Sequence, residues 1–394
     1  MSLTLLLDMD DTLLTNDMDR FLPAYLSSLS RHLSNRVAPE DLVKSLLAGT
    51  KAMVQKWLPG KRLVDTFDEV FYPEIGQSKE ELFNQIQQFY AQVYPTLQSV
   101  TQVRPEAVDF VDWAFAQGYT IAIATNPLFP RTAIEQRLAW AKLPVDKYPF
   151  KIVSSYEGFH FAKPNPAFLA EMIGQLEWPD QPVCFVGNSL TDDIQPANEL
   201  GLPAFLLLPS AASNGDNSGD FLALKEWIKT LIDHPYAVPN TPEAFIAILS
   251  STPAALDSIA SKLGRDAWRR RPRENEWSLG EIFCHLRDVD LEVTLPRIHR
   301  ILKEDTPFIT AEATDIWAEE RHYYYQDPFD AFNGFLQART DLLLAMHHME
   351  PADWLRPARH AIFGPTTLAE LITFTITHDQ NHVRQVGATV RDLQ

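Results

Sequence analysis

The sequence predicts an α/β doubly wound fold over residues 1–238, followed by an all-α up-down four-helix bundle over residues 239–394. In the first part, short apolar runs alternate with longer segments of helical spacing, which is typical of buried parallel strands connected by helices. In the second part only helical patterns occur. A chain of 394 residues is long enough for two or three domains.

Four apolar runs are predicted to be strands of the sheet, at residues 3–7, 120–124, 183–186 and 204–208. The stretch between the first two runs, about residues 15–103, has no strong strand signal, and residues 80–94 within it have helical spacing. We therefore expect a helical cap inserted after the first strand.

A small, polar segment at residues 209–220 predicts a loop, and residues 221–232 predict a helix. Three prolines follow, Pro235, Pro239 and Pro242. Because proline cannot continue a helix, the boundary between the two domains is placed at about residue 238.

Two capping boxes mark helix starts in the second part. Ser278 precedes Glu281, and Thr367 precedes Glu370, by the three residues that allow side chain and backbone to bond reciprocally. Further helical segments are expected at residues 254–263 and 329–346. Connections of short or moderate length favour an antiparallel bundle, through which the chain could also form oligomers.

The composition narrows the classes of partner. The formal net charge of −18 argues against binding to nucleic acid and to anionic membranes. No apolar run approaches the roughly 20 residues of a membrane span, and the first residues lack the pattern of a signal peptide. The two cysteines, Cys184 and Cys284, fall in different predicted domains and form no disulfide framework. A cytoplasmic protein is expected.

Polar side chains follow the predicted strands, at the edge where open α/β sheets bind ligands. Asp8 and Asp10 follow the first strand. Two carboxylates about 4 Å apart repel by roughly 1 kcal/mol in water and by roughly 4 kcal/mol at an effective dielectric of about 20. A cation removes this repulsion, and Mg²⁺ prefers oxygen ligands. Thr125 and Asn126 follow the second strand with a hydroxyl and an amide, and Lys163 can neutralise a phosphate.

A further group of oxygen donors follows the third predicted strand, in the segment Gly187-Asn188-Ser189-Leu190-Thr191-Asp192-Asp193. With the DxDxT pattern of Asp8, Asp10 and Thr12, with Thr125-Asn126 and with Lys163-Pro164, this segment resembles the haloacid dehalogenase superfamily over residues 3–208. The resemblance implies a Rossmann-like phosphatase core with a cap that shapes substrate choice.

The resemblance also implies roles for individual residues. Asp8 is expected to attack phosphorus and form an aspartyl-phosphate, and Asp10 to act as general acid and base. Thr125, Asn126 and Lys163 are expected to bind the phosphate. The expected Mg²⁺ ligands are Asp8, Asp10, Asn188 and Asp193.

The sequence departs from the family pattern at two positions. Asn188 stands where an acidic ligand is common, and Asp11 stands where glycine is frequent. An amide oxygen can still coordinate a metal, but it brings no charge. Asp193 fits the remaining acidic position better than Asp192, because Ile194 follows it as in many relatives.

A second candidate site lies in the predicted bundle. His378 and His382 are four residues apart, so they share one helix face, and His285 lies one turn after the first capping box. Three histidines with an open fourth position are typical of a catalytic Zn²⁺ site, and Ni²⁺ is an alternative. The segment from Trp277 to Leu286, together with the His378–His382 pair and Gln385, resembles the DinB-like metal-binding bundles.

The sequence thus predicts a magnesium-dependent phosphohydrolase of small phosphorylated molecules, fused to a metal-binding bundle. Two alternatives stay open at this point. The bundle could be the enzyme, as a metal-dependent transferase or isomerase that uses a thiol, or the whole chain could be a non-enzymatic metal sensor or binding module.

Overall fold

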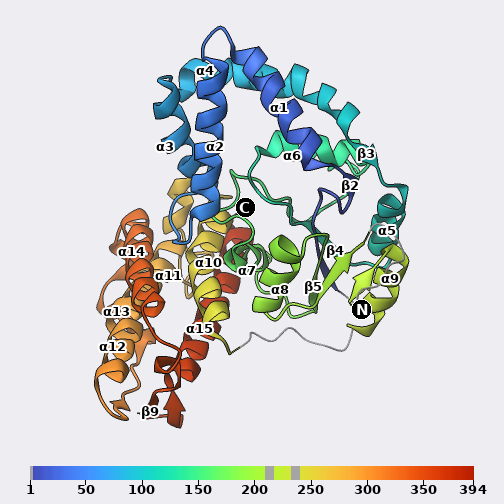
Figure 1. Ribbon diagram of the computed structural model, residues 1–394. Coiled ribbons are helices and arrows are strands. Elements are labelled where there is room, and N and C mark those ends of the chain that lie inside the picture. The colour runs from blue at the N-terminus through green and yellow to red at the C-terminus, as the bar shows by residue number, and fades with distance from the viewer. Residues whose placement is uncertain (1–2, 209–216, 232–239) are drawn as a thin grey trace. The chain divides into compact units, whose positions relative to one another are not determined.

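The computed structural model describes residues 3–208, 217–231 and 240–394 (Figure 1). The predicted boundary near residue 238, with Pro235 and Pro239, and most of the predicted loop 209–220 lie outside these residues. Contacts within the chain define two compact units. The first contains residues 1–56, 61–169 and 179–237, and the second contains residues 57–60, 170–178 and 238–394.

A parallel sheet forms the centre of the first unit, in the order β4-β1-β5-β6-β7. Its strands are β1 (Thr4–Leu7), β4 (Thr120–Ile123), β5 (Val183–Gly187), β6 (Ala204–Leu207) and β7 (Ser218–Gly219). All of β1 and β5 is buried, as expected for strands that are covered on both faces. The first four strands lie where the sequence predicts them, whereas β7 is too short to give a periodic signal.

Helices connect these strands, which confirms the doubly wound α/β prediction. They are α5 (Pro105–Ala116), α6 (Arg131–Trp140), α7 (Pro166–Gln175), α8 (Gln195–Glu199) and α9 (Phe221–Thr230). Local sequence explains where they begin: Pro105 occupies the first position of α5, and the Asp220 carboxylate accepts the backbone N–H groups of Leu222 and Ala223 at the start of α9.

The helical cap expected after the first strand is present (Figure 1). It consists of α1 (Met18–Leu33), α2 (Pro39–Gln55), α3 (Leu63–Ile75), α4 (Lys79–Gln88), a π-helical turn η1 (Phe89–Val93) and a 3₁₀ helix η2 (Tyr94–Val100). The two ends of this insertion meet where β2 (Leu14–Thr15) pairs antiparallel with β3 (Gln102–Val103). The cap therefore leaves the core and returns to it at one place.

Long helices form the body of the second unit. They are α10 (Pro242–Ala260), α11 (Leu279–Val289), which continues through a π-helical turn η5 (Asp290–Thr294) into α12 (Leu295–Lys303), α14 (Pro328–His347) and α15 (Leu368–Leu393). Both predicted capping boxes are formed, at Ser278 with Glu281 and at Thr367 with Glu370.

The order of helices around this bundle differs from the simple up-and-down order expected. α10 packs mainly on α15 and α14, whereas α11 packs mainly on α14 and less on α15. The consecutive helices α10 and α11 are therefore diagonal, as are α14 and α15, whereas α11 and α14 are adjacent. Long connections permit this order, since residues 261–278 separate α10 from α11.

The expectation of helices alone in the second part was incomplete. A small sheet of order β10-β9-β8 is formed by β8 (Phe308–Ile309), β9 (Pro357–His360) and β10 (Gly364–Thr367). Its hairpin turns at Gly364, whose φ of 75° favours glycine. Short helical turns complete the unit: η4 (Arg265–Arg269), η6 (Thr314–Ile316), α13 (Trp317–Glu320), η7 (Tyr323–Tyr325) and η8 (Asp353–Leu355).

A buried arginine joins the four long helices of the bundle. Arg339 on α14 is fully buried and donates through Nε to Asp290 Oδ2 (2.7 Å) and through Nη1 to Asp379 Oδ2 (2.6 Å) and to the Leu249 carbonyl (2.9 Å). Burial is tolerated because the guanidinium meets two carboxylates and a carbonyl at once. Within the described part of the chain, no helix is both long enough and apolar enough to cross a membrane.

Candidate active site and candidate metal centre

The ammonium group of Lys163 lies between two buried carboxylates at the edge of the parallel sheet. Lys163 Nζ is 2.8 Å from Asp8 Oδ1 and 2.6 Å from Asp193 Oδ1. Asp8 follows β1 directly, and Asp193 belongs to the π-helical turn η3 (Leu190–Ile194) after β5. The neighbouring strands β1 and β5 thus bring together residues that lie 185 positions apart, because both strands end at the same edge of the sheet.

The position of Asp193 depends on a glycine and on backbone N–H groups. A Cβ atom on Gly187 would lie 2.3 Å from Asp193 Oδ2, so only glycine leaves room for this carboxylate. Asp193 Oδ2 accepts the backbone N–H groups of Asn188 and Ser189, each at 3.0 Å. The carboxylate is therefore fixed before any ligand binds. The neighbouring Asp192, which fits the acidic position of the motif less well than Asp193, is exposed.

Two oxygen atoms converge on the hydroxyl group of Thr12. Thr12 Oγ1 lies 3.0 Å from Asp8 Oδ2 and 3.3 Å from Asn188 Oδ1. A carboxylate oxygen and an amide oxygen thus face one small polar group, and oxygen donors of this kind suit Mg²⁺. Of the four predicted Mg²⁺ ligands, Asp8 and Asn188 present oxygens here, and both oxygens of Asp8 and of Asp193 accept hydrogen bonds within the protein.

The Asp10 carboxylate is held by an arginine that the sequence analysis did not single out. Arg137 Nη1 lies 2.5 Å from Asp10 Oδ2, and Asn16 Nδ2 donates to Asp10 Oδ1 at 2.8 Å. Arg137 is 1% exposed, and its Nε and Nη2 atoms have no hydrogen-bond partner among the described residues. Asp8 and Asp10 therefore have different cationic partners. No sequence signal marked Arg137, because a single arginine in a helix is usually solvated.

Asp11 adopts a backbone conformation that explains the frequent glycine at this position. Its φ is 57°, in the left-handed region that costs a residue with a Cβ about 1–2 kcal/mol. Local bonds offset this cost: Asp11 Oδ1 accepts the Asn16 N–H at 2.8 Å, and Arg104 Nη1 donates to the carbonyls of Asp11 (2.7 Å) and Thr12 (3.0 Å).

Thr125 and Asn126 follow β4 at the same edge of the sheet. Thr125 is buried, and its carbonyl accepts the Ser154 hydroxyl at 2.6 Å. The Asn126 side chain accepts the backbone N–H of Lys163 at 3.2 Å. Asn126 thus positions the lysine, a role that the sequence pattern did not indicate, since it was expected only to bind phosphate.

Burial and ion pairing act in opposite directions on the central groups. Burial raises the pKa of Asp8 to about 7, although Lys163 opposes this shift. For Lys163, burial lowers the pKa, but Asp8 and Asp193 outweigh it and the net pKa lies above the ordinary value. The lysine is therefore a permanent cation, whereas Asp8 titrates near neutral pH.

Three imidazoles converge in the second unit, as the sequence predicts. His285 Nε2 lies 2.9 Å from His378 Nε2, and His382 Nε2 lies 3.2 Å from the same atom. These three histidines are the group of potential ligands found among the described residues, with one ligand atom from each within 4.8 Å of the others. Two come from one face of α15 and one from α11. A single divalent ion can contact all three.

The surroundings of His285 and His382 favour the neutral form of the ring, which is the form that binds a metal. Burial, followed by the neighbouring imidazoles, lowers the pKa of His285 to about 3 and that of His382 to about 4. His382 Nδ1 pairs with Gln385 Oε1 at 2.8 Å, which leaves the Nε2 lone pair directed at the other two rings. His378 precedes Asp379, which Arg339 holds from the other side.

We expect Asp10 and Arg137 to be energetically coupled, because the pair is largely shielded from solvent. A double-mutant cycle with Asp10→Asn and Arg137→Met should give a coupling of about 1 kcal/mol or more in urea denaturation. The exposed pair Arg131–Glu135, also with 2.5 Å between its charged atoms, is the matched control and should give below about 0.5 kcal/mol. Equal coupling in the two pairs would show that Arg137 does not bind Asp10 in solution.

Comparison with known proteins agrees with this geometry. The family model of the haloacid dehalogenase-like hydrolases matches residues 3–201, and that of the DinB superfamily matches residues 248–386. No curated protein matches.

Similar solved structures include a HAD phosphatase from Thermococcus onnurineus (19% identity, 60% of this chain and 100% of that chain, TM-score 0.36). A 2-haloacid dehalogenase from Pseudomonas syringae pv. Tomato is similar over 58% of this chain and 99% of that chain, with 20% identity and a TM-score of 0.41. YfiT from Bacillus subtilis, whose four-helix bundle topology is described as unusual, has 17% identity over 39% of this chain and 89% of its own, with a TM-score of 0.35. With half of its residues matched by the family model, the chain belongs to the haloacid dehalogenase-like hydrolases and carries a DinB-superfamily region after the hydrolase part.

Proposed function

We propose that the first unit is a magnesium-dependent phosphohydrolase that acts on a small phosphorylated molecule through an aspartyl-phosphate. The observation that carries this proposal is the buried Lys163 ammonium between Asp8 and Asp193. A carboxylate beside a fixed cation suits attack on an anionic phosphoryl group, since the cation can neutralise the charge that accumulates during transfer.

In this proposal, Asp8 attacks phosphorus and the P–O bond to the alcohol breaks. Asp10 donates a proton to the departing oxygen, and it then takes a proton from the water that hydrolyses the aspartyl-phosphate. Arg137 and Asn16 hold the two oxygens of Asp10 in one orientation for both steps. Lys163 and Thr125 stabilise the negative charge on the transferring oxygens.

The residues around Thr12 fit a bound Mg²⁺. Asp8 and Asn188 would hold it with side-chain oxygens, and Asp193 and Asp10 complete the acidic surroundings. When bound, Mg²⁺ would neutralise phosphate charge and bring nucleophile and phosphate together. Because Asn188 contributes no charge, Asn188→Asp should tighten the binding of Mg²⁺.

Asp8→Asn should abolish phosphatase turnover, because an amide cannot form the acyl phosphate. Asp192→Asn is the matched control: it makes the same chemical change on an exposed neighbour of Asp193 and should leave the rate unchanged. Turnover of generic phosphate esters with Mg²⁺ measures both effects, with circular dichroism to confirm folding. A near-normal rate for Asp8→Asn would exclude Asp8 as the nucleophile.

Binding of Mg²⁺ should weaken as the pH falls below about 7. Burial raises the pKa of Asp8 to about 7, so that a proton and the metal compete for the same carboxylate. The affinity should fall by up to about tenfold per pH unit below that pKa. Calorimetric titration with MgCl₂ at pH 6 and pH 8 tests this expectation, which pH-independent affinity would contradict.

We also propose that the second unit binds one divalent transition metal, Zn²⁺ or Ni²⁺, through His285, His378 and His382. The convergence of three imidazole Nε2 atoms supports this proposal, because one divalent cation could accept a lone pair from each of them. Three protein ligands leave one position for water or a substrate.

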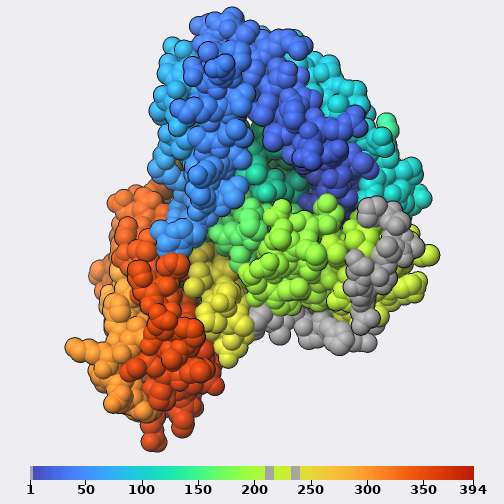
Figure 2. All heavy atoms as spheres, in the orientation of Figure 1, coloured from blue at the N-terminus to red at the C-terminus, as the bar shows by residue number. Residues whose placement is uncertain are grey.

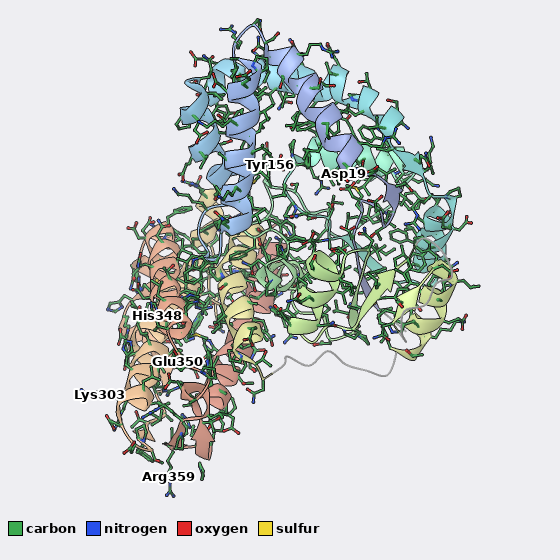
Figure 3. All side chains as sticks on the ribbon, in the orientation of Figure 1. Asp19, Tyr156, Lys303, His348, Glu350 and Arg359 are labelled. Carbon is green, nitrogen blue, oxygen red and sulfur yellow. The ribbon has the colours of Figure 1, made fainter. Side chains whose placement is uncertain are left out.

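His382→Ala should lower the metal content of the purified protein to well below one equivalent while leaving phosphatase turnover unchanged. His348→Ala is the control, because His348 is exposed and lies outside the cluster (labelled in Figure 3). Elemental analysis of the wild type and both variants measures the effect. Equal metal content in all three proteins would show that His382 does not bind a metal.

A further inference from the structure

The cap contains an apolar cavity that neither proposed reaction site includes. Its volume is about 270 Å³, close to the lower end of the ~300–1,000 Å³ that is usual for small-molecule sites. Figure 2 shows the surface hollowed among the blue helices of the cap, above the green-blue atoms of the core. The cavity is large enough for an alkyl chain or an aromatic ring.

One face of α1 forms much of the cavity wall. Met18, Leu22, Leu26, Leu29 and Leu33 all line it, at the three- and four-residue spacing of a single helix face. Leu22 and Leu26 are only partly buried. Helices α2, α3 and α4 contribute mainly further apolar side chains to the wall, among them Leu46, Phe67, Phe71, Phe83 and Ile86.

Two pairs of polar side chains in the wall are already bonded to each other. The hydroxyl groups of Tyr25 and Tyr90 are 3.0 Å apart, and Lys79 Nζ lies 2.6 Å from Asp68 Oδ2. A sugar in this cavity would have to compete with these pairs for hydrogen bonds, whereas a hydrocarbon group would not.

The floor of the cavity belongs to the hydrolase core. It is formed by Leu128, Phe129 and Pro130, which lie in the same loop as Thr125 and Asn126, and by Tyr156 (labelled in Figure 3). The cap and the phosphate-binding loop therefore share this space.

Two contacts connect the cavity wall to Asp10. The Phe129 ring centroid lies 4.7 Å from the Arg137 guanidinium carbon, and Arg137 binds Asp10. On the opposite oxygen, Asn16 Nδ2 contacts both Asp10 and the sulfur of Met18 (3.8 Å). Only one side chain therefore separates the cavity from Asp10, the group that would protonate the departing alcohol. The organic part of a substrate must lie on this side of the phosphate.

We infer that the substrate is a phosphate monoester of an apolar alcohol, aliphatic or aromatic, whose hydrocarbon part occupies this cavity. The inference rests on the proposed phosphohydrolase and adds the class of its substrate. Each methylene group of a hydrocarbon that is buried in the cavity should raise the binding affinity by about fourfold.

The first test compares kcat/KM for methyl, butyl and hexyl phosphate. For the wild type, kcat/KM should rise by at least tenfold from methyl to hexyl. Leu26→Trp fills the cavity and should reduce this ratio to near one. Ser27→Trp adds the same side chain at the exposed neighbouring position of α1 and should keep the ratio of the wild type. Thermal unfolding of both variants checks that they are folded.

A second measurement does not depend on turnover. Hexylphosphonate should bind at least tenfold more tightly than methylphosphonate by calorimetry, and Leu26→Trp should remove the difference. Equal affinity of the two phosphonates, or a ratio that Leu26→Trp leaves intact, would overturn the inference. If the phosphonates differ as expected but no ester is hydrolysed, the proposed reaction is wrong and the recognition of a hydrocarbon group stands.

Discussion

The active-site half of this molecule depends on one buried ammonium group. Lys163 is the cation that lies between the buried carboxyl groups of Asp8 and Asp193. Its position is set by Asn126, which binds its backbone, and the room for Asp193 is set by Gly187. Burying these charged groups together costs less free energy than burying any one of them alone. The attraction between the lysine and each carboxylate offsets part of the desolvation of both partners. The paired strands β1 and β5 place Asp8 and Asp193, and the ion pairs with Lys163 hold the three side chains together.

The fold was predictable to the extent that periodicity encodes it. The four main strands, the helical insertion and both capping boxes in the second part follow from spacing that a single sequence contains. The diagonal order of the bundle and the hairpin at Gly364 do not, since they depend on which helix faces meet and on strands of only two to four residues. Short elements give too few residues for a period to be recognised.

The candidate sites show the same division. Sequence motifs indicated Asp8, Lys163 and the three histidines, because their spacing and their positions in the predicted strands and helices are typical of reactive or metal-binding residues. Arg137, Asn16 and Arg339 could not be recognised, because a polar residue inside a helix or loop gives no sign in the sequence of being buried beside a charge. The partners of the two arginines are also distant in sequence: 127 residues separate Asp10 from Arg137, and 49 separate Asp290 from Arg339.

Arg339 also limits how the bundle can diverge. Its guanidinium meets residues from three other helices, so Arg339, Asp290 and Asp379 are favourable only as a set. Exchange of α14 for the corresponding helix of a relative without this arginine would leave two buried acids uncompensated next to His378. Substitutions at these three positions should therefore be inherited together, and their joint presence or loss among related chains would trace which bundles share this core.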